Sequence, residues 1–384
     1  MKIENVETFL VDRFLIVRIT TEDGIQGIGE STFWAFPKAA EEIIKGFTPD
    51  LLGKDASDID FIWNYLHRKF SFRGNAISAA ISAIDIALWD IKGKSLGKPV
   101  YELLGGPVRN KVRLYTHLSS NDKDELYEEA KSRVEEGFTA VRLYPFGNFG
   151  DRSFSEGVGL EKMSFTSMQR HAAERVEKVR EAVGPDVDIM IDVVNRLSPS
   201  EAIAIGNALR DYNLYFFEDP IEPENMDAWE QVASRQPIPI AMAERLYTIY
   251  QFRDLLNHNG AAYLRPDPSL VGGITNLMKI GAIAQASYAS VVPHNPLSSV
   301  LTAACAQIDG ALHNIPVQEY PYDDNSGVKA DLVKEPLRRE GGYLHIPDKP
   351  GIGIELNEEA FKHYPAKSYI RPPLIFEDGS LKDY

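Results

Sequence analysis

The sequence has little cysteine and no long apolar run. Its single cysteine, Cys305, cannot form an internal disulfide, and the apolar stretch around it (LTAACAQI) is typical of a packed small side chain rather than a nucleophile. No apolar run approaches the roughly 18 residues that a membrane helix needs, so we expect no membrane association. The first residues, MKIENVETFLV, lack the basic and apolar regions of a signal peptide, which favours a cytoplasmic protein.

Positive charge is scarce as well. The chain has 41 lysines and arginines against 56 aspartates and glutamates, and the net charge of −15 argues against a nucleic-acid partner. We therefore expect the partner to be a small molecule. The length of 384 residues suits one barrel of about 200–250 residues plus a second domain.

The first hundred residues predict a small α+β domain, residues 1–110. Strand-like alternation runs through VETFLVDRFLIVRITT and GIQGIGE, which predicts a hairpin with its turn at Asp23-Gly24. We interpret Gly27 and Gly29 as strand-end positions. Helical spacing follows over 37–103 and ends at Gly105-Gly106-Pro107; the apolar residues that show it best are Ile77, Ile81, Ile84 and Leu88.

From residue 111 onward, short apolar runs alternate with amphipathic stretches. This alternation predicts an α/β fold with a parallel (β/α)8 barrel over residues 111–320. Helix starts are indicated by Thr166 and by Ser198-Pro199. Beyond Tyr320 the chain is rich in turns, and we expect residues 321–384 to fold back onto the first domain. The eight runs are KVRLYTHL, TAVRLYPF, VDIMIDVV, LYFFEDP, IPIAMAER, AAYLRPDP, ASVVPHN and NIPVQEY.

Polar residues end most of these runs, where a barrel of this kind carries its chemistry. Asp192, Glu218 and Glu244 follow one another at intervals of 26 residues, so we expect three carboxylates on neighbouring strands. A single acid at such a place could equally be a helix cap or a solvated loop charge. Three converging carboxylates need a cation, and an all-oxygen set predicts Mg²⁺. The later runs end in Asp267, His294 and Glu319.

The order of these residues resembles the mandelate racemase group of the enolase superfamily. Four segments are similar as well: SAIDIALWDIKGKSLGKPVYELLGG, FFEDPIEPEN, VGGITNLMKI and VVPHN. The resemblance implies a barrel of the enolase type, with an α+β capping domain formed by the N-terminal part and the C-terminal tail. It implies one Mg²⁺ per subunit on Asp192, Glu218 and Glu244, and a homo-oligomer between dimer and octamer.

The resemblance also implies roles for the later residues. Asp267 would hold one imidazole nitrogen of His294 and raise the basicity of the other, which makes the two an acid/base pair. Glu319 would hydrogen-bond the substrate carboxylate and, if protonated, donate to the enediolate. A salt bridge at the barrel rim is the alternative for Glu319.

Two departures from the family pattern narrow the reaction. Arg142-Leu143-Tyr144 stands where racemases have Lys-x-Lys, so Tyr144, its pKa lowered by Arg142, could act as base or acid. Alternatively both residues only bind substrate. Val194 stands where certain dehydratases have a histidine that acts as the acid and expels the hydroxyl group. His294 would therefore protonate the departing 3-hydroxyl, and Asn195 and Arg196 would contact substrate.

The expected activity is Mg²⁺-dependent dehydration of a sugar acid to a 2-keto-3-deoxy acid. TAVRLYPFGNFG and the tail RPPLIFEDGSLKDY look similar to archaeal gluconate dehydratases, which favours a five- or six-carbon aldonate, or else an aldarate. Trp34, Phe36 and Arg73 of the capping domain would line the pocket. The alternatives are an epimerase, racemase or cycloisomerase on the same scaffold, and a non-catalytic protein that binds a sugar acid.

Overall fold

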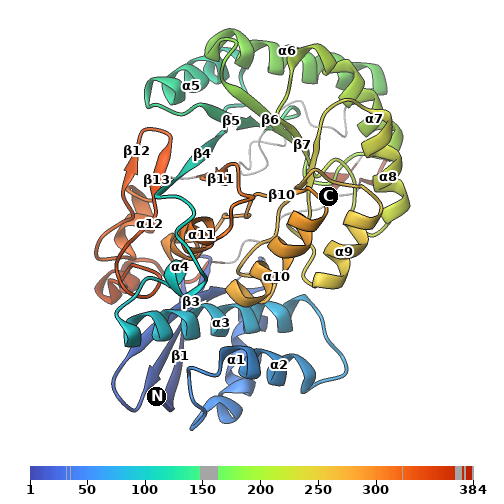
Figure 1. The fold of residues 1–384 in the computed structure, drawn as a ribbon. Helices are drawn as coiled ribbons and strands as arrows, with labels where there is room; N and C mark the ends of the chain where they lie inside the picture. The colour runs from blue at the N-terminus through green and yellow to red at the C-terminus, as the bar shows by residue number, and fades with distance from the viewer. Residues whose placement is uncertain are drawn as a thin grey trace.

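The first part of the chain is a three-stranded antiparallel sheet covered by helices (Figure 1). The computed structural model describes residues 1–31, 33–34, 36–147, 163–321, 323–367, 374–375 and 378–382. The strands are β1 (Ile3–Val11), β2 (Phe14–Thr21) and β3 (Gln26–Ser31). The helices are α1 (Pro37–Leu51), α2 (Ile59–Arg68), α3 (Asn75–Leu96) and α4 (Val100–Leu103).

Two details of this part differ from the prediction. The stretch expected as one strand is itself a hairpin, because Asp12 adopts a left-handed φ of 51° and reverses the chain between β1 and β2. Gly27 and Gly29 lie inside β3 rather than at strand ends. A Cβ at Gly29 would stand 2.0 Å from the carbonyl oxygen of Ala83, so glycine is required because α3 packs directly against the strand.

Eight parallel strands follow in the order β11-β4-β5-β6-β7-β8-β9-β10. Each lies within one of the predicted runs, which confirms the predicted alternation of strands and helices. Between β10 and the approach to β11, the Val291 amide donates to the Asn314 carbonyl at 2.9 Å. The strands are β4 (Lys111–Leu118), β5 (Ala140–Leu143), β6 (Asp188–Asp192), β7 (Phe216–Glu218), β8 (Ile240–Met242), β9 (Tyr263–Leu264), β10 (Ser290–Val291) and β11 (Gln318–Glu319).

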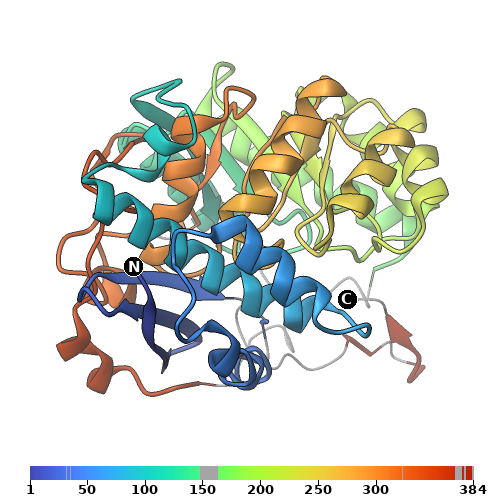
Figure 2. The same ribbon diagram turned by 60° about the horizontal axis from the view of Figure 1, so that its bottom comes forward.

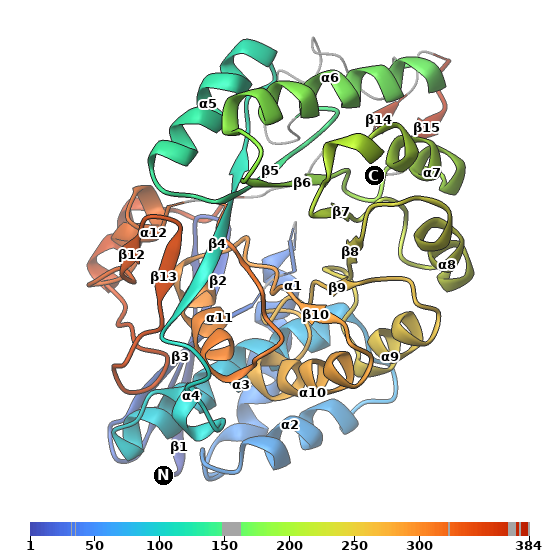
Figure 3. The same ribbon diagram turned by 45° about the horizontal axis from the view of Figure 1, so that its top comes forward.

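A helix connects each strand to the next, and α5 to α9 lie outside the curve of strands (Figure 3). Helix α7 begins at the predicted cap, Ser198, which forms a capping box with Glu201. Helix α6 is capped by Ser164 instead of Thr166, because Ser164 has the extended backbone of an N-cap. The helices are α5 (Lys123–Glu135), α6 (Phe165–Val183), α7 (Pro199–Ala208), η3 (Arg210–Tyr212), α8 (Met226–Arg235), α9 (Ile249–Asn257), α10 (Gly273–Ala286) and α11 (Ser299–Ala311).

The C-terminal segment contacts both parts of the molecule. Strand β13 pairs antiparallel with β4 of the barrel. Farther on, the Asp12 amide donates to the Tyr364 carbonyl at 2.9 Å, and Figure 2 shows this orange-to-red segment beside the blue first sheet. No described helix is long and apolar enough to cross a membrane. The elements are α12 (Gly327–Asp331), β12 (Arg339–Glu340), β13 (Tyr343–His345), η4 (Glu358–His363), β14 (Leu374–Ile375) and β15 (Leu381–Lys382).

Candidate active site

Charged side chains sit directly above an apolar layer inside the barrel. Side chains of a strand alternate between its two faces, so a residue two positions after a layer residue points the same way. The layer includes Tyr115, Ala140, Met190, Phe216, Val292 and Val317. Two residues farther along each strand stand His117, Arg142, Asp192, Glu218, His294 and Glu319. The strand period alone therefore gathers these polar groups at the carboxyl end of the barrel.

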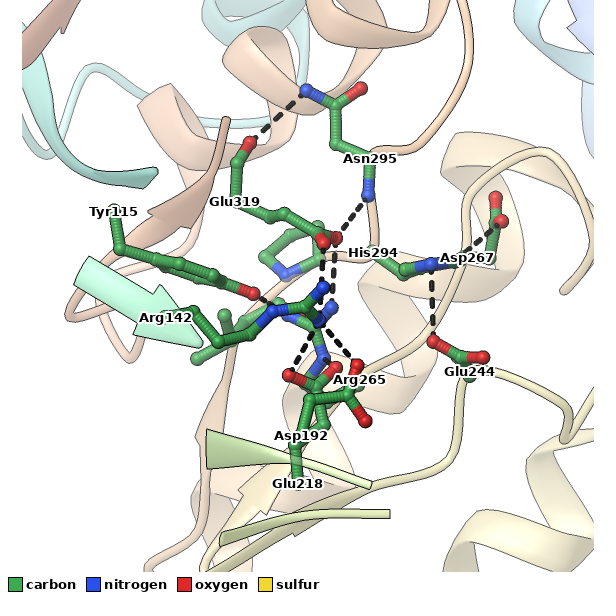
Figure 4. Close-up of polar contacts among 12 residues, drawn as sticks. Tyr115, Arg142, Asp192, Glu218, Glu244, Arg265, Asp267, His294, Asn295 and Glu319 are labelled. Atoms are coloured by element: carbon green, nitrogen blue, oxygen red, sulfur yellow. Dashed lines mark hydrogen bonds and ion pairs between the residues drawn. The ribbon is translucent and has the colours of Figure 1, made fainter. Parts of the chain in front are cut away.

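Arg142 lies at the centre of this group (Figure 4). Its Nη1 is 2.8 Å from Asp192 Oδ2 and 2.9 Å from Glu218 Oε2, and the side chain is only 3% exposed. Its Nη2 donates to Tyr144 Oη at 2.6 Å. Asp192 and Glu218 pair in register on β6 and β7, so their carboxylates reach the same nitrogen. Arg142 thus neutralises two of the three predicted metal ligands and holds the phenol of Tyr144.

The third predicted ligand, Glu244, does not join them. It lies two residues beyond the end of β8, after Ala243, whose φ of 103° is rare for a residue with a side chain. Glu244 Oε2 is 3.1 Å from His294 Nε2 instead. The described residues accordingly contain no group of three His, Cys, Asp or Glu side chains placed to hold a metal ion.

The predicted acid/base pair is brought together. His294 Nδ1 lies 3.0 Å from Asp267 Oδ2, while Asp267 Oδ1 accepts from the Ser269 amide at 2.8 Å. Burial lowers the pKa of His294, but Glu244, Glu319 and Asp267 outweigh it and raise the pKa to about 10. The imidazole is therefore a cation here, and both of its nitrogens carry protons.

Glu319 is held as a carboxylate. Its Oε2 accepts from Arg265 Nη2 and from the Asn295 amide, each at 2.8 Å. Burial opposes ionisation, yet Arg265, His294 and His117 keep the pKa of Glu319 well below its usual range. The condition for donation to an enediolate, a protonated Glu319, is not met in this arrangement.

Sequence reasoning missed Arg265 and His117. Arg265 is fully buried; its Nε lies 2.5 Å from Glu218 Oε1, and its Nη1 donates to Tyr115 Oη at 2.6 Å. His117 accepts at Nδ1 from Arg142 at 3.0 Å, and its Nε2 lies 2.9 Å from Glu319 Oε1. Burial, reinforced by Arg142, lowers the pKa of His117 to about 4, so this imidazole is neutral. The available signal was one ionisable side chain near the end of each apolar run (KVRLYTHL, AAYLRPDP).

The donor chemistry nevertheless fits a divalent cation. Burial raises the pKa of Asp192 to about 7 against the opposing effect of Arg142, and Glu218 and Glu244 raise it further. Burial and the same two glutamates hold the pKa of Asp219 well above its usual value. An additional cation would relieve this repulsion. The permanent cations at this end of the barrel include Arg142 and Arg265. The acids outnumber them and include Asp192, Glu218, Asp219, Glu244, Asp267 and Glu319.

The residues that were predicted to contact substrate lie in different surroundings. The Trp34 ring lies 6.4 Å from the His294 ring. Asn195 is buried, and its Nδ2 donates to the Ile221 carbonyl at 2.6 Å; Arg196 donates to the Val193 carbonyl at 2.9 Å. Both therefore brace the loops after β6 and β7.

Arg73 and Phe36 do not reach the charged cluster. Arg73 is exposed, and its Nη1 lies 2.9 Å from His67 Nε2 within the N-terminal part. Phe36 is 56% exposed and its ring lies against Phe33. Much of the segment TAVRLYPFGNFG is described, but residues 148–150 and most of the tail RPPLIFEDGSLKDY fall outside the described residues.

Comparisons with known proteins agree with this fold. Residues 4–105 match the N-terminal domain of the mandelate racemase / muconate lactonizing enzyme family, and residues 125–360 match the enolase C-terminal domain-like family. The D-galactonate dehydratase of Variovorax paradoxus (strain S110) is 34% identical over the full length of both chains. A D-galactonate dehydratase family member of Pseudarthrobacter chlorophenolicus is 33% identical, also over both full lengths.

Two solved structures are similar throughout. An enolase from Agrobacterium radiobacter, a proposed galactarate dehydratase bound to sodium and L-malate, has a TM-score of 0.91 and 30% identity over both full chains. The 3,6-anhydro-D-galactonate cycloisomerase of Zobellia galactanivorans has a TM-score of 0.84 and 28% identity over 95% of this chain and 99% of that one. The resemblance and the fold predicted from the sequence are thereby confirmed.

Proposed function

The chain belongs to the mandelate racemase / muconate lactonizing enzyme family, and we propose that it is a hydro-lyase that removes water from a sugar acid. The observation that carries the proposal is the buried pair of His294 and Asp267 facing a cluster of carboxylates at the mouth of the barrel. The relatives named D-galactonate dehydratase support this reaction class. A protein that only bound its ligand would have no use for an oriented imidazole.

Removal of an α-proton beside a carboxylate creates a second negative charge, which must be stabilised. Asp192, Glu218 and Glu244 would hold Mg²⁺, and the bound ion would supply that stabilisation. Because Arg142 Nη1 is shared by Asp192 and Glu218, the guanidinium has to leave this point when the ion is held. Arg142 remains tied to Tyr144 and His117 through Nη2, so it can turn toward the substrate carboxylate.

Two residues move the protons. Tyr144 first loses its proton to solvent, and the guanidinium of Arg142 stabilises the phenolate, which then takes the proton from C2 and becomes a phenol again. His294, oriented by Asp267, donates its proton to the 3-hydroxyl as the C3–O bond breaks, and water leaves. The resulting enol takes up a proton at C3 and becomes a 2-keto-3-deoxy acid. In the alternative route His294 first loses a proton to solvent, and the neutral imidazole then takes the proton from C2 and donates it to the 3-hydroxyl.

The substrate that we propose is a five- or six-carbon aldonate, with aldarates as the second group, and the names of the relatives support this class. A cycloisomerase is the competing activity, because a structural neighbour of that name shares the fold along nearly the whole chain. An epimerase would likewise use His294 without loss of a hydroxyl group. A dehydratase and an epimerase differ in their products, since only dehydration generates a 2-keto acid from an aldonate.

A panel experiment tests the proposal. The purified protein is incubated with Mg²⁺ and a panel of aldonates and aldarates, and 2-keto acid is detected as its semicarbazone. The expected result is keto-acid formation from one or a few stereoisomers, lost in His294→Asn. Epimerised sugar acid without a keto product would assign an epimerase instead.

A further inference from the structure

Two buried carboxylates of the N-terminal part sit at the starts of barrel helices. Helix α10 begins directly after the loop that carries Asp267, and α11 begins directly after the loop that carries His294. Each helix start exposes backbone N–H groups that need acceptors. Asp85 of α3 supplies an acceptor to α10, and Glu30 of β3 supplies acceptors to α11. The two loops of the acid/base pair thus each end on an acid from outside the barrel.

Helix α10 has no cap of its own. Its N-cap residue is Gly272, which has no side chain, and Asp85 Oδ2 instead accepts from the Thr275 amide at 3.0 Å. The fit is close, since a Cβ at Gly273 would stand 2.3 Å from the same oxygen. Trp63 Nε1 also donates to the Gly272 carbonyl at 2.8 Å. Helix α10 is therefore fixed at its first turn by side chains of α2 and α3.

Helix α11 is capped by Ser298 but has no acid of its own to complete a capping box. Ser298 accepts from the Val300 amide at 3.1 Å, but the third helical residue is Leu301, which cannot return a bond as a glutamate would. Glu30 takes that part: its Oε1 and Oε2 accept from the Ser298 amide, each at 3.2 Å, and its Oε2 also accepts from the Leu301 amide at 3.0 Å and from Ser298 Oγ at 2.7 Å. The missing acid of the capping box is thus supplied by another part of the molecule.

Short, bonded loops connect these helix starts to the acid/base pair. The Asp267 carbonyl accepts from the Leu270 and Val271 amides, each at 2.9 Å, so the chain turns tightly between Asp267 and α10. Between His294 and α11, the Pro296 carbonyl accepts from Arg13 Nη2 at 2.9 Å. A shift of either helix start must therefore move Asp267 or His294.

We propose that Glu30 and Asp85 are positioning residues, through which the capping domain holds the side chains of Asp267 and His294 at their correct distance from each other. The carboxylates bridge the two domains at the helix starts that follow the loops of Asp267 and His294. Their loss would loosen the contact between His294 Nδ1 and Asp267 Oδ2, now 3.0 Å, rather than the fold as a whole. This inference goes beyond the proposed function and relies on it only for the role of the pair.

Asp90 provides a matched control. It lies on the same helix α3, is fully buried, and accepts from the Ile28 and Ile352 amides, each at 2.9 Å. Those amides belong to neither loop of the acid/base pair. Asp90→Asn should therefore reproduce the cost of losing a buried acid in the capping domain without disturbing His294 or Asp267.

The experiment compares Glu30→Gln, Asp85→Asn and Asp90→Asn by kinetics and by NMR. Each substitution replaces one carboxylate oxygen, which accepts hydrogen bonds, with an NH₂ group, which donates and therefore faces other N–H or O–H donors. We expect kcat to fall about 10- to 100-fold in the first two variants with KM nearly unchanged, since small misplacements of catalytic groups have effects of this size. The third variant should retain kcat within about twofold of the wild-type value.

The NMR measurement is independent of turnover. The protein has eight histidines, so spectra of ¹³Cε1-histidine-labelled protein are simple, and the resonance missing from His294→Asn identifies His294. Glu30→Gln and Asp85→Asn should shift or broaden that resonance, whereas Asp90→Asn should not. If Glu30→Gln fails to fold, Ser298→Ala removes the hydroxyl contact with Glu30 and the bond from the Val300 amide but keeps the Leu301 bond to Glu30, and it should give a smaller shift.

Two results would overturn the inference: an unchanged His294 resonance in the Glu30 and Asp85 variants, or an equal change in Asp90→Asn. A protein that turned over no sugar acid would contradict the proposed function, while the NMR comparison would still decide the positioning role. The two failures are thus distinguishable.

Discussion

Removal of the Arg142 charge is the most informative perturbation of the carboxylate cluster. Arg142→Gln would remove contacts of 2.8 Å to Asp192 and 2.9 Å to Glu218, both almost inaccessible to solvent, and would leave Asp192 without this cation while Glu218 keeps Arg265. Breaking a buried ion pair by deleting one partner costs about 3–5 kcal/mol, because the remaining charge stays buried. We expect the free energy of unfolding to fall by that amount in EDTA at pH 8, measured by urea denaturation.

Added Mg²⁺ should partly reverse this loss. In the wild-type protein Mg²⁺ competes with Arg142 for two carboxylates, whereas in the variant Arg142 no longer occupies them. Mg²⁺ should therefore stabilise the variant more than the wild type, and calorimetric titration should show tighter binding to the variant. Arg113→Gln is the control, since Arg113 pairs with Asp188 at 2.7 Å where both side chains are part-exposed, and its pair should contribute at most about 1 kcal/mol. The reasoning is refuted if Arg142→Gln costs less than about 1 kcal/mol or if Mg²⁺ stabilises both proteins equally.

Four further predictions concern the proton-transfer groups, pH and the metal. His294→Asn should lower the dehydration rate by about 10²–10⁴-fold in steady-state kinetics. Tyr144→Phe should cause a similar fall in kcat; a fall below about tenfold would assign both transfers to His294. Burial raises the pKa of Asp85 from 3.8 to about 7, so its contribution to stability is present below pH 4 and is lost as the pH rises through 7. Asp85→Asn should therefore make the free energy of unfolding less dependent on pH between pH 4.5 and 8, measured in EDTA. Chelation should abolish turnover and Mg²⁺ should restore it; full activity after dialysis against EDTA would contradict the proposed cofactor.

The barrel could be predicted from the sequence because its strands are buried on both sides and read as continuous apolar runs. The hairpin turn at Asp12 could not, because Asp12-Arg13 carries none of the glycine or asparagine that marks most two-residue turns. The glycines of β3 were misplaced for a related reason. Their requirement comes from the approach of α3, a contact between segments far apart in the chain.

The acids and His294 were predictable because each ends an apolar run, where the barrel collects its polar groups. Their pairing was not, since it depends on strand register and on the conformation of single residues. Arg142 reaches Asp192 because β5 and β6 are neighbours, and Glu244 is diverted by the backbone at Ala243. Glu30 and Asp85 gave no sequence signal at all, because nothing local distinguishes a buried acid from a solvated one.

The account's central claim is the loss of water from a sugar acid, and proton NMR of turnover in deuterium oxide tests it most directly. If the claim is right, the aldonate that gives a keto signal will yield a 2-keto-3-deoxy acid with one deuterium at C3, and Asp267→Asn and His294→Asn will yield none. Deuterium at C2 of an intact or epimerised sugar acid, with no keto product, would contradict it.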